Sequence, residues 1–517
     1  MMLQKLTSTF VKYGMVLLAC LTITPAHAAT PEFTDEADVV VIGAGSAGLS
    51  ATMTLMQGGV KKIIVLEKNP FPGGTSNVAE GVLGVESRMQ RNHYFGPPML
   101  TKDMVFKHEM NFNHWKGNAR LMRKYINMSG ATINWLQDMG VPFEEVAQTT
   151  FDGVRTWHVV HEHGKGLIKV LFGLAKQSPN VKIMMETPAT RLIADKNNDV
   201  IGVAAAGKKG EIRIKAKSVI VATGGFADNP ELVKKYVGNT YAGPVANFGK
   251  VGFGLTQLQA LGAKTEGLGT LMNSAVYDKR KAKMGAPNLV DLEFDALGQQ
   301  PNNIMVNNYG ERFCDELIAN NFVLQANAVE RQPGNFAWVI FDENLRKHYV
   351  NDGIDAGMGV IVPIGTKLEK LNGAIDKYIA AGDRNVYAAE SIEELADKIK
   401  VPAGTLKKTI ETYNKAASVN KDDEFAKDPY FMSPLSGKLY AMRLVLSYLV
   451  TVGGVSTDLN MRPVRPDDKP IKGVYVIGSD VGGLFGDSYG LDSPGTTFGF
   501  AVNSGRIAGL HFLESYK

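Results

Sequence analysis

Residues 38–50 read DVVVIGAGSAGLS, and residues 63–68 read IIVLEK. The order is an apolar run, a Gly-x-Gly-x-x-Gly turn, a segment of small residues, and a second apolar run that ends in an acid. This order predicts a strand, a tight turn into a helix, and a second strand. Glu67 then lies at the end of the second strand, where an ordinary glycine-rich turn gives no reason for an acid.

Each glycine of the turn has its own physical role. Gly43 permits the tight turn, Gly45 lets the backbone approach a pyrophosphate, and Gly48 lets the helix pack against the strand. The helix N-terminus offers N–H groups to phosphate, and Glu67 is placed to accept a hydrogen bond from a ribose hydroxyl. The stretch therefore predicts a dinucleotide-binding site.

The composition is that of a folded globular protein. The chain has 517 residues, of which 44% are hydrophobic and 21% charged, and this length allows two or more domains. The net charge of +4 is small, and no long run of like charges occurs. We therefore expect a small-molecule partner and no nucleic acid.

The N-terminus has the features of an export signal. Lys5 and Lys12 precede an apolar run at residues 15–23, and Ala26-His27-Ala28 supplies a cleavage site. We expect cleavage after Ala28 and a periplasmic mature chain without a transmembrane segment, because the apolar run is too short to span a bilayer. The alternative is a lipoprotein, since residues 17–20 (LLAC) loosely resemble its cleavage box.

Cysteine usage limits the redox chemistry of the mature chain. Only Cys314 remains after cleavage at Ala28, so an intrachain disulfide is not expected. No Cys-x-x-Cys-His motif occurs, so we expect no c-type haem on this chain.

The glycine-rich motifs divide the chain. Residues from about 270 to 435 lack the fingerprint and mix strands with charged helices, whereas glycines return after Tyr440. This predicts one nucleotide-binding domain that is split by an inserted cap. The expected divisions are a signal peptide at residues 1–28, the first part of the nucleotide-binding domain at 29–269, a capping domain at 270–439 and the second part of the nucleotide-binding domain at 440–517.

Further motifs follow the fingerprint in order. They are residues 73–77 (GGTSN), 222–225 (ATGG), 307–313 (NNYGERF), 473–480 (GVYVIGSD) and 505–509 (GRIAG). Together with the fingerprint they resemble the FAD-dependent fumarate reductase/succinate dehydrogenase flavoprotein superfamily, in its exported flavocytochrome c type without the haem domain. The resemblance covers about residues 36–517. It implies an α/β fold with a split Rossmann-like FAD-binding domain and an inserted α+β capping domain.

The resemblance also implies non-covalent FAD as the cofactor. A helix N-terminus at the pyrimidine end of the flavin would stabilise negative charge there. The implied cofactor residues are Gly43, Gly45, Ala47 and Gly48 at the pyrophosphate, Glu67 and Lys68 at the adenosine ribose, Gly74, Thr75, Ser76 and Gly81 along the flavin side, Ala189 at the adenine, Asp480 at the ribityl chain, and Thr497 and Phe498 at the pyrimidine end.

The chain departs from the family at the dicarboxylate clamp. Leu449 and Val450 stand where fumarate reductases have two histidines, and Asn320 and Asp492 stand where they have arginines. The proton relay of the family falls on Ala296 and Gln299. A dicarboxylate would meet repulsion in such a pocket. We expect instead a larger activated alkene, such as an aryl acrylate or an enone, beside apolar and aromatic side chains: Tyr448, Tyr489, Leu449, Val450 and Phe485.

The implied reaction is hydride transfer from FAD to an activated C=C bond, with protonation by an acid of the protein. The candidates for this acid are Tyr448, Tyr489 and Asp492. The alternatives are core packing for the two tyrosines and a turn or cap for Asp492. Because the chain has no haem motif and no second dinucleotide fingerprint, a separate cytochrome c is expected to supply electrons in anaerobic respiration.

Three other functions stay open on the sequence alone. They are an FAD-dependent dehydrogenase of the ketosteroid type, a fumarate reductase with an atypical site, and a non-catalytic flavin-binding protein. A metal site is not expected, although His158, His161, Glu162 and His163 lie within six residues, because the family has a flavin- or substrate-facing loop there.

Overall fold

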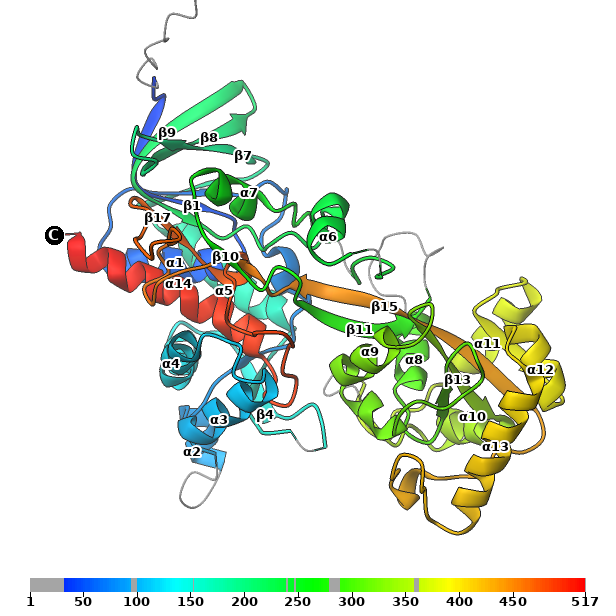
Figure 1. Cartoon of the computed structure of the whole chain (residues 1–517). Coiled ribbons are helices and arrows are strands. Elements are labelled where there is room, and N and C mark those ends of the chain that lie inside the picture. Colours follow the sequence, from blue (N-terminus) through cyan, green and yellow to red (C-terminus); the bar gives the residue numbers. More distant parts are fainter. Residues whose placement is uncertain are drawn as a thin grey trace, which may run out of the picture.

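The computed structural model describes residues 32–93, 100–151, 153–238, 240–245, 248–278, 289–357 and 362–516. The predicted signal peptide and its cleavage site lie outside these residues. The chain forms two bodies, and strands β11 (Leu271–Tyr277) and β15 (Leu439–Thr451) run between them (Figure 1). Within the described ranges, no helix combines the length and apolar character that a bilayer crossing requires.

A seven-stranded sheet forms the centre of the first body. Its order is β6-β2-β1-β9-β8-β7, and β17 also pairs with β9. Strand β1 is parallel to β2 and β9, and its residues Val39–Val41 are fully buried, as in parallel sheets covered on both faces. The strands are β1 (Asp35–Ile42), β2 (Ile63–Leu66), β6 (Val181–Met184), β7 (Ala189–Ala194), β8 (Val200–Gly207), β9 (Gly210–Val221) and β17 (Val474–Val476).

The two ends of the chain pack against each other on this sheet. Helix α1 (Ser46–Gln57) lies along helix α14 (Thr496–Ser515) (Figure 1). A methyl group on Gly505 would collide with the carbonyl oxygen of Ala47, so glycine allows this close approach. The remaining helices of this body are α2 (Arg88–His93), α3 (Lys102–Phe112), α4 (Ala119–Asp138), α5 (Gly164–Gln177), α6 (Pro230–Tyr236), α7 (Phe253–Ala260), η1 (Gly74–Val78) and η4 (Gly478–Asp480).

The first body also contains two small sheets. A three-stranded sheet has the order β3-β5-β4. A two-stranded sheet pairs β10 with β16. These strands are β3 (Gly81–Leu83), β4 (Phe143–Ala147), β5 (Trp157–Val160), β10 (Thr265–Glu266) and β16 (Gly454–Val455).

The second body is the capping domain, built on a five-stranded sheet with the order β11-β15-β13-β12 and with β14 also paired to β15. Its other strands are β12 (Ile304–Val306), β13 (Phe336–Asp342) and β14 (Val386–Ala389). Its helices are α8 (Leu289–Gly298), α9 (Phe322–Glu330), α10 (Glu343–Asn351), α11 (Leu371–Ala380), α12 (Ile392–Ile399), α13 (Ala403–Ser418), η2 (Glu316–Asn320) and η3 (Pro429–Phe431).

The chain crosses from the capping domain to the nucleotide-binding domain within strand β15. Its residues up to Leu446 belong to the hydrophobic core of the capping domain, and those from Tyr448 onward belong to the core of the nucleotide-binding domain. The second junction expected from the sequence, between residues 439 and 440, falls at the start of this strand. The capping domain thus extends about half a strand further than expected.

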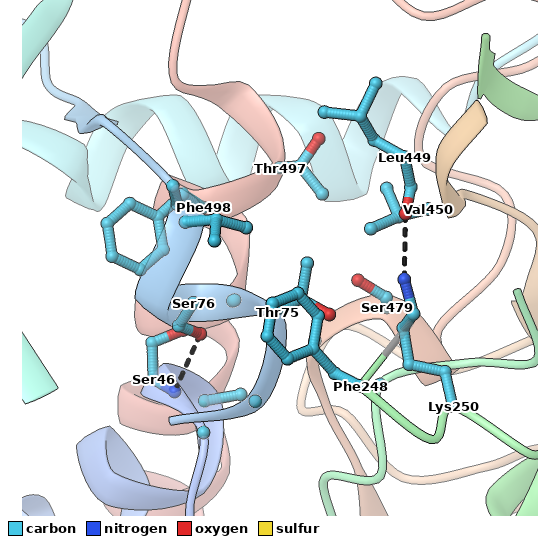
Figure 2. Close-up of a pocket in the computed structure, with 18 of the residues that line it drawn as sticks. Ser46, Thr75, Ser76, Phe248, Lys250, Leu449, Val450, Ser479, Thr497 and Phe498 are labelled. Carbon is cyan, nitrogen blue, oxygen red and sulfur yellow. Dashed lines mark hydrogen bonds between the residues drawn. The ribbon is translucent and has the colours of Figure 1, made fainter. Parts of the chain in front are cut away.

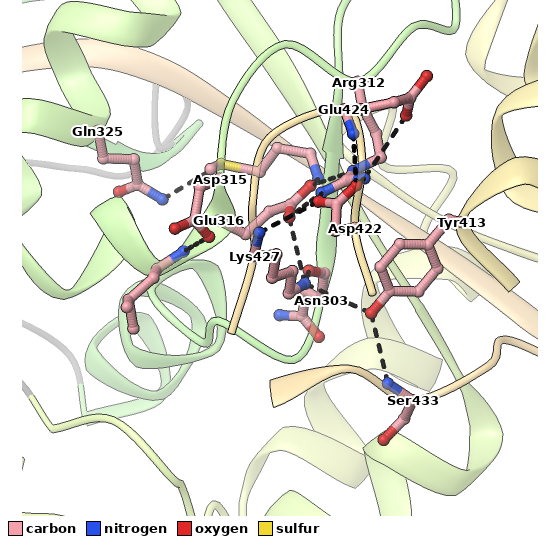
Figure 3. Close-up of polar contacts among 12 residues, drawn as sticks. Asn303, Arg312, Asp315, Glu316, Gln325, Tyr413, Asp422, Glu424, Lys427 and Ser433 are labelled. Atoms are coloured by element: carbon pink, nitrogen blue, oxygen red, sulfur yellow. Dashed lines mark hydrogen bonds and ion pairs between the residues drawn. The ribbon is translucent and has the colours of Figure 1, made fainter. Parts of the chain in front are cut away.

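A buried network of charges holds the centre of the capping domain (Figure 3). The Arg312 guanidinium pairs with Glu316 at 2.8 Å and with Asp422 at 3.1 Å, and the Lys427 ammonium lies 3.1 Å from Glu316. These four side chains are at most 1% exposed. Because Glu316 begins η2, the network fixes the short helix that ends at Asn320.

Candidate active site

A cavity of about 390 Å³ runs from the glycine turn after β1 to the capping domain. Residues of both bodies line it, among them Ser46 and Thr497 of the first body and Asn320 and Phe322 of the cap. Figure 2 shows part of the wall, to which the turn at Ser46, the start of α14 at Thr497 and the end of β15 at Leu449 all contribute. The cavity therefore joins the predicted cofactor cradle to the predicted substrate region.

The glycine turn forms an anion cradle. Gly43 has a φ of 107°, and a methyl group on it would collide with the carbonyl oxygen of Ala222. Helix α1 begins at Gly45 without a side-chain cap, and the Ser46 N–H donates to the Ser76 Oγ at 3.1 Å. An uncapped helix N-terminus that opens on a cavity suits a pyrophosphate. Gly48 does not line the cavity but allows α1 to approach the Gly43 carbonyl, which is the packing role expected of it.

The two residues expected at the adenosine ribose line the same cavity. Both carboxylate oxygens of Glu67 accept backbone hydrogen bonds, from the N–H of Ala44 and of Asn69, each at 2.9 Å. The Lys68 ammonium donates to the Gly249 carbonyl, and burial lowers its pKa. Gly74, Thr75, Ser76, Gly81 and Ala189, also expected at the cofactor, line the cavity as well.

Asp480 does not line the cavity, contrary to the expected contact with the ribityl chain. Its carboxylate accepts hydrogen bonds from the N–H groups of Gly224 and Gly225, at 3.0 and 3.1 Å, and from the backbone and hydroxyl of Thr223. The carboxylate therefore holds the glycine turn after β9. The neighbouring Ser479 lines the cavity in its place.

The start of α14 forms another part of the wall. Gly495, with a φ of 87°, begins this helix without a side-chain cap, and Thr497 and Phe498 line the cavity. Tyr489 lines it too, and burial, partly offset by contact with Thr497, raises the pKa of its hydroxyl to about 12. The hydroxyl thus stays protonated at neutral pH. Of the three residues expected as the proton donor, Tyr489 lines the cavity, whereas Tyr448 and Asp492 do not.

Tyr448 is a core residue rather than an acid of the site. Its hydroxyl donates to the Ala227 carbonyl at 3.0 Å, and its ring packs edge-on against Tyr241 at 5.7 Å. It does not line the cavity. Phe485, expected to shape the pocket, also lies behind the wall and packs against Tyr489 at 5.1 Å.

Asp492 also fails as a proton donor. Burial raises its pKa, but the ion pair with His108 at 3.7 Å and hydrogen bonds from Thr150 and Asn321 outweigh this and lower the pKa below its usual value. The carboxylate is therefore charged, whereas the expected role required a protonated acid. Glu109, which the sequence gave no reason to select, lies close by, and burial raises its pKa to about 7.

Contacts near Asp492 join the two bodies at the mouth of the cavity. The Phe151 N–H donates to the Asn320 Oδ1 at 2.7 Å, and the Asn321 Nδ2 donates to Asp492 at 3.0 Å. The ring of Phe151 stacks on Phe431 of the cap at 5.9 Å. Asn320, which replaces a catalytic arginine of the family pattern, thus positions the cap and also lines the cavity.

The cap end of the cavity is mostly apolar. Among the described residues that line the cavity, no arginine or histidine occurs. The polar groups at this end are Gln299, Asn320, Thr149 and the Lys250 ammonium, and the apolar ones are Met272, Phe322, Leu449, Val450, Leu491 and Trp157. An ionic clamp for two carboxylates is therefore missing from this part of the cavity.

Lys250 is a functional candidate that sequence reasoning missed. It lines the cavity, its side chain is only 4% exposed, and its ammonium donates to the Leu449 carbonyl at 2.8 Å (Figure 2). A single lysine in a glycine-rich segment gives no sequence pattern that distinguishes it from a solvated one.

The four clustered residues between His158 and His163 do not converge on a metal. His158 hydrogen-bonds the Ser87 hydroxyl at 2.6 Å, whereas His161 pairs with Glu144 and His163 with Glu80. Over the described part of the chain, no group of three or more histidine, cysteine and acidic side chains is arranged to hold a metal ion.

The cavity fits FAD. The strand–turn–helix cradle, the acid at the end of β2 and the two uncapped helix N-termini all line one continuous space. Glycine at position 43 is required by the backbone conformation and the close approach of Ala222. These residues would hold the pyrophosphate, the adenosine and the flavin in the order that the sequence predicts.

Comparison with known proteins agrees with this geometry. The sequence model of the FAD binding domain family matches residues 38–495. The vinyl phenol reductase of Lactiplantibacillus plantarum is 32% identical over 486 residues, which cover 93% of this chain and 97% of that protein.

Two solved structures share the fold. One is the open conformation of a flavocytochrome c3 fumarate reductase, with a TM-score of 0.66, 23% identity, and coverage of 93% of this chain and 79% of that one. The other is the 3-ketosteroid-Δ4-(5α)-dehydrogenase of Rhodococcus jostii, with a TM-score of 0.73, 22% identity, and coverage of 94% and 99%. The chain belongs to the FAD binding domain family, with FAD as its cofactor, and is an FAD-dependent oxidoreductase.

Proposed function

We propose that the protein reduces the C=C bond of an aryl-substituted or similarly bulky activated alkene. The observation that carries this proposal is the cap end of the cavity, which is apolar and has no arginine or histidine among its described residues. The similarity to a vinyl phenol reductase supports the same substrate class. An aromatic ring would be buried against Leu449, Val450 and Phe322.

Bound FAD supplies a hydride, and this chain must supply a proton to the other carbon of the double bond. Tyr489 is our candidate for that acid, because it lines the cavity and its hydroxyl, with a pKa of about 12, is protonated at neutral pH. Thr497 lies near the hydroxyl and also lines the cavity. The surrounding apolar side chains exclude water from the reacting bond.

We expect fumarate to be a poor substrate. A dicarboxylate would lose several charge-assisted hydrogen bonds of the family clamp, each worth about 1.5–3 kcal/mol. Steady-state rates should be measured anaerobically with reduced viologen as donor, on fumarate, a cinnamate and a vinyl phenol. The aromatic alkenes should turn over at least about tenfold faster, which corresponds to one such hydrogen bond. A fumarate rate that exceeds both aromatic rates would show that other residues form a clamp.

The same assay separates the competing functions. An enzyme that runs toward oxidation would reduce an artificial acceptor with the saturated compound and show little activity with viologen. A flavin-binding protein without catalysis would do neither, although it would still retain FAD.

We further propose that the protein is exported and receives electrons from a separate cytochrome c. This proposal rests on the basic start, the apolar run at residues 15–23 and the cleavage site at Ala28. The intact mass of the protein from the periplasmic fraction should correspond to a chain that begins at Ala29. A start at Cys20 with added lipid mass would contradict it in favour of the lipoprotein alternative.

A further inference from the structure

Lys250 is a buried cation that the proposed reaction does not yet use. It lies in the segment between the glycine turn after β9 and helix α7, and it lines the cavity with 4% of its side chain exposed. Its ammonium reaches the Leu449 carbonyl at 2.8 Å, beside Val450 and Ser479 (Figure 2). It is therefore next to the positions where the family clamp has its histidines.

The ammonium is only partly satisfied by the protein. An ammonium carries three N–H donors, and Leu449 accepts one of them. Asp228 is its ion-pair partner, but at 3.9 Å the two groups are too far apart for a hydrogen bond. The second carboxylate oxygen of Asp228 instead accepts from the N–H groups of Phe248 and Lys250, at 3.0 and 2.7 Å. Asp228 thus shapes the loop and leaves donor capacity on the lysine.

The other charged groups that line the cavity have closer partners of their own. Glu67 accepts from two backbone N–H groups, Lys68 donates to the Gly249 carbonyl, and Glu80 pairs with His163. Tyr448, which packs near Asp228, donates to the Ala227 carbonyl. Lys68 also keeps N–H donors, but it lies beside Glu67 at the predicted adenosine end. Among the described residues of the cavity wall, Lys250 is the ammonium that has donors left for a ligand beside Leu449.

We propose that Lys250 binds an anionic oxygen of the substrate, either a carboxylate or a phenolate conjugated to the reacting alkene. This inference rests on the proposed function and names the ligand group that the pocket selects. A single buried cation pairs with one anionic oxygen group and leaves a second carboxylate uncompensated. The site would therefore accept an aromatic monoanion and reject a dicarboxylate. Burial lowers the pKa of Lys250. The preference for an anion should therefore be present at low pH and be lost as the pH rises, and this loss should begin at a lower pH than for an exposed lysine.

The test measures binding of saturated ligands, which cannot turn over, to the oxidised holoenzyme. Perturbation of the flavin absorbance gives dissociation constants for 3-phenylpropanoate and its amide, and for 4-ethylphenol and its methyl ether. Either 3-phenylpropanoate should bind about ten- to a hundredfold tighter than its amide, or 4-ethylphenol, which would release its proton to solvent and bind as the phenolate, should exceed its methyl ether by the same factor, as expected of one charge-assisted hydrogen bond. The carboxylate and phenol pairs distinguish the two sources of the oxygen.

Lys250→Met should remove this preference while the neutral ligands still bind, and Lys250→Arg should keep much of it. The control is Lys407→Met, which removes an exposed lysine of the capping domain. A preference that survives in Lys250→Met overturns the proposal, and so does equal binding of charged and neutral ligands to the wild type. Loss of FAD from both Lys250 variants would also overturn it, because the lysine would then serve the cofactor. If no aromatic ligand binds to the wild type, the proposed function itself fails.

Discussion

Glu316→Leu is expected to destabilise the capping domain by about 3–5 kcal/mol, the usual cost of removing one partner from a buried ion pair. The Glu316 carboxylate accepts hydrogen bonds from Arg312 at 2.9 and 2.8 Å and from the Met305 N–H at 3.2 Å, and it lies 3.1 Å from the Lys427 ammonium. Leucine would leave two buried cations facing one buried carboxylate, that of Asp422, and the half-exposed Glu424, which lies 3.6 Å from Arg312. The free energy of unfolding should be measured by urea denaturation of the holoenzyme.

The matched control is Glu393→Leu, which removes one partner of an exposed pair with Lys407. Exposed ion pairs contribute little to stability, so this variant should unfold like the wild type. A loss of less than about 1 kcal/mol in Glu316→Leu would place the network in the range of a surface pair and contradict its structural role. Because the network fixes the helix that ends at Asn320, a folded fraction of Glu316→Leu should also show a raised KM.

Gly43→Ala is expected to lose FAD. The residue has a φ of 107°, a conformation that costs an L-residue about 1–2 kcal/mol, and the new methyl group would also collide with the Ala222 carbonyl. If the turn moves to relieve this strain, the loss of about 1–2 kcal/mol corresponds to about 5- to 30-fold weaker FAD binding. The collision with Ala222 should weaken binding further. The ratio of FAD to protein after gel filtration and the dissociation constant of the reconstituted apoprotein measure the effect.

Gly173→Ala is the control for this substitution. Gly173 lies in α5, and a methyl group there would meet no heavy atom within 4 Å. FAD binding should be unchanged, and the helix should be stabilised by about 0.5–1 kcal/mol, since glycine in a helix interior is unfavourable. Full FAD occupancy in Gly43→Ala would show that the turn does not carry the pyrophosphate.

The cofactor side of the site can be predicted from the sequence because its geometry is local, and the residues predicted there line the cavity except for Gly48 and Asp480. The turn at Gly43 and the acid at Glu67 are fixed by a strand, a glycine pattern and a second strand, all of which are read from short-range spacing. The inserted cap was also recognisable, because residues from about 270 to 435 lack the glycine fingerprint and mix strands with charged helices, among them β13 (Phe336–Asp342) and α13 (Ala403–Ser418). The comparisons with known proteins confirm this fold and its FAD.

The substrate side was harder to predict because tertiary contacts decide where each side chain points. Tyr448 lies one residue before the cavity wall, yet its hydroxyl is bound by Ala227, far away in the chain. Asp492, in the loop before α14, is kept charged by hydrogen bonds and by its ion pair with His108 of α3. Lys250 becomes a buried cation only because β15 passes over it. None of these relations leaves a periodic or spaced pattern in the sequence.

The central claim, that this FAD enzyme reduces a bulky aromatic alkene and not a dicarboxylate, is tested most directly in a single turnover. Holoenzyme reduced anaerobically should be mixed in a stopped-flow instrument with a vinyl phenol, a cinnamate or fumarate. We predict that at least one aromatic alkene restores the oxidised FAD absorbance, with one saturated product per FAD, while fumarate reacts at least about tenfold more slowly. Rapid reoxidation by fumarate with no reaction of either aromatic alkene would contradict the account.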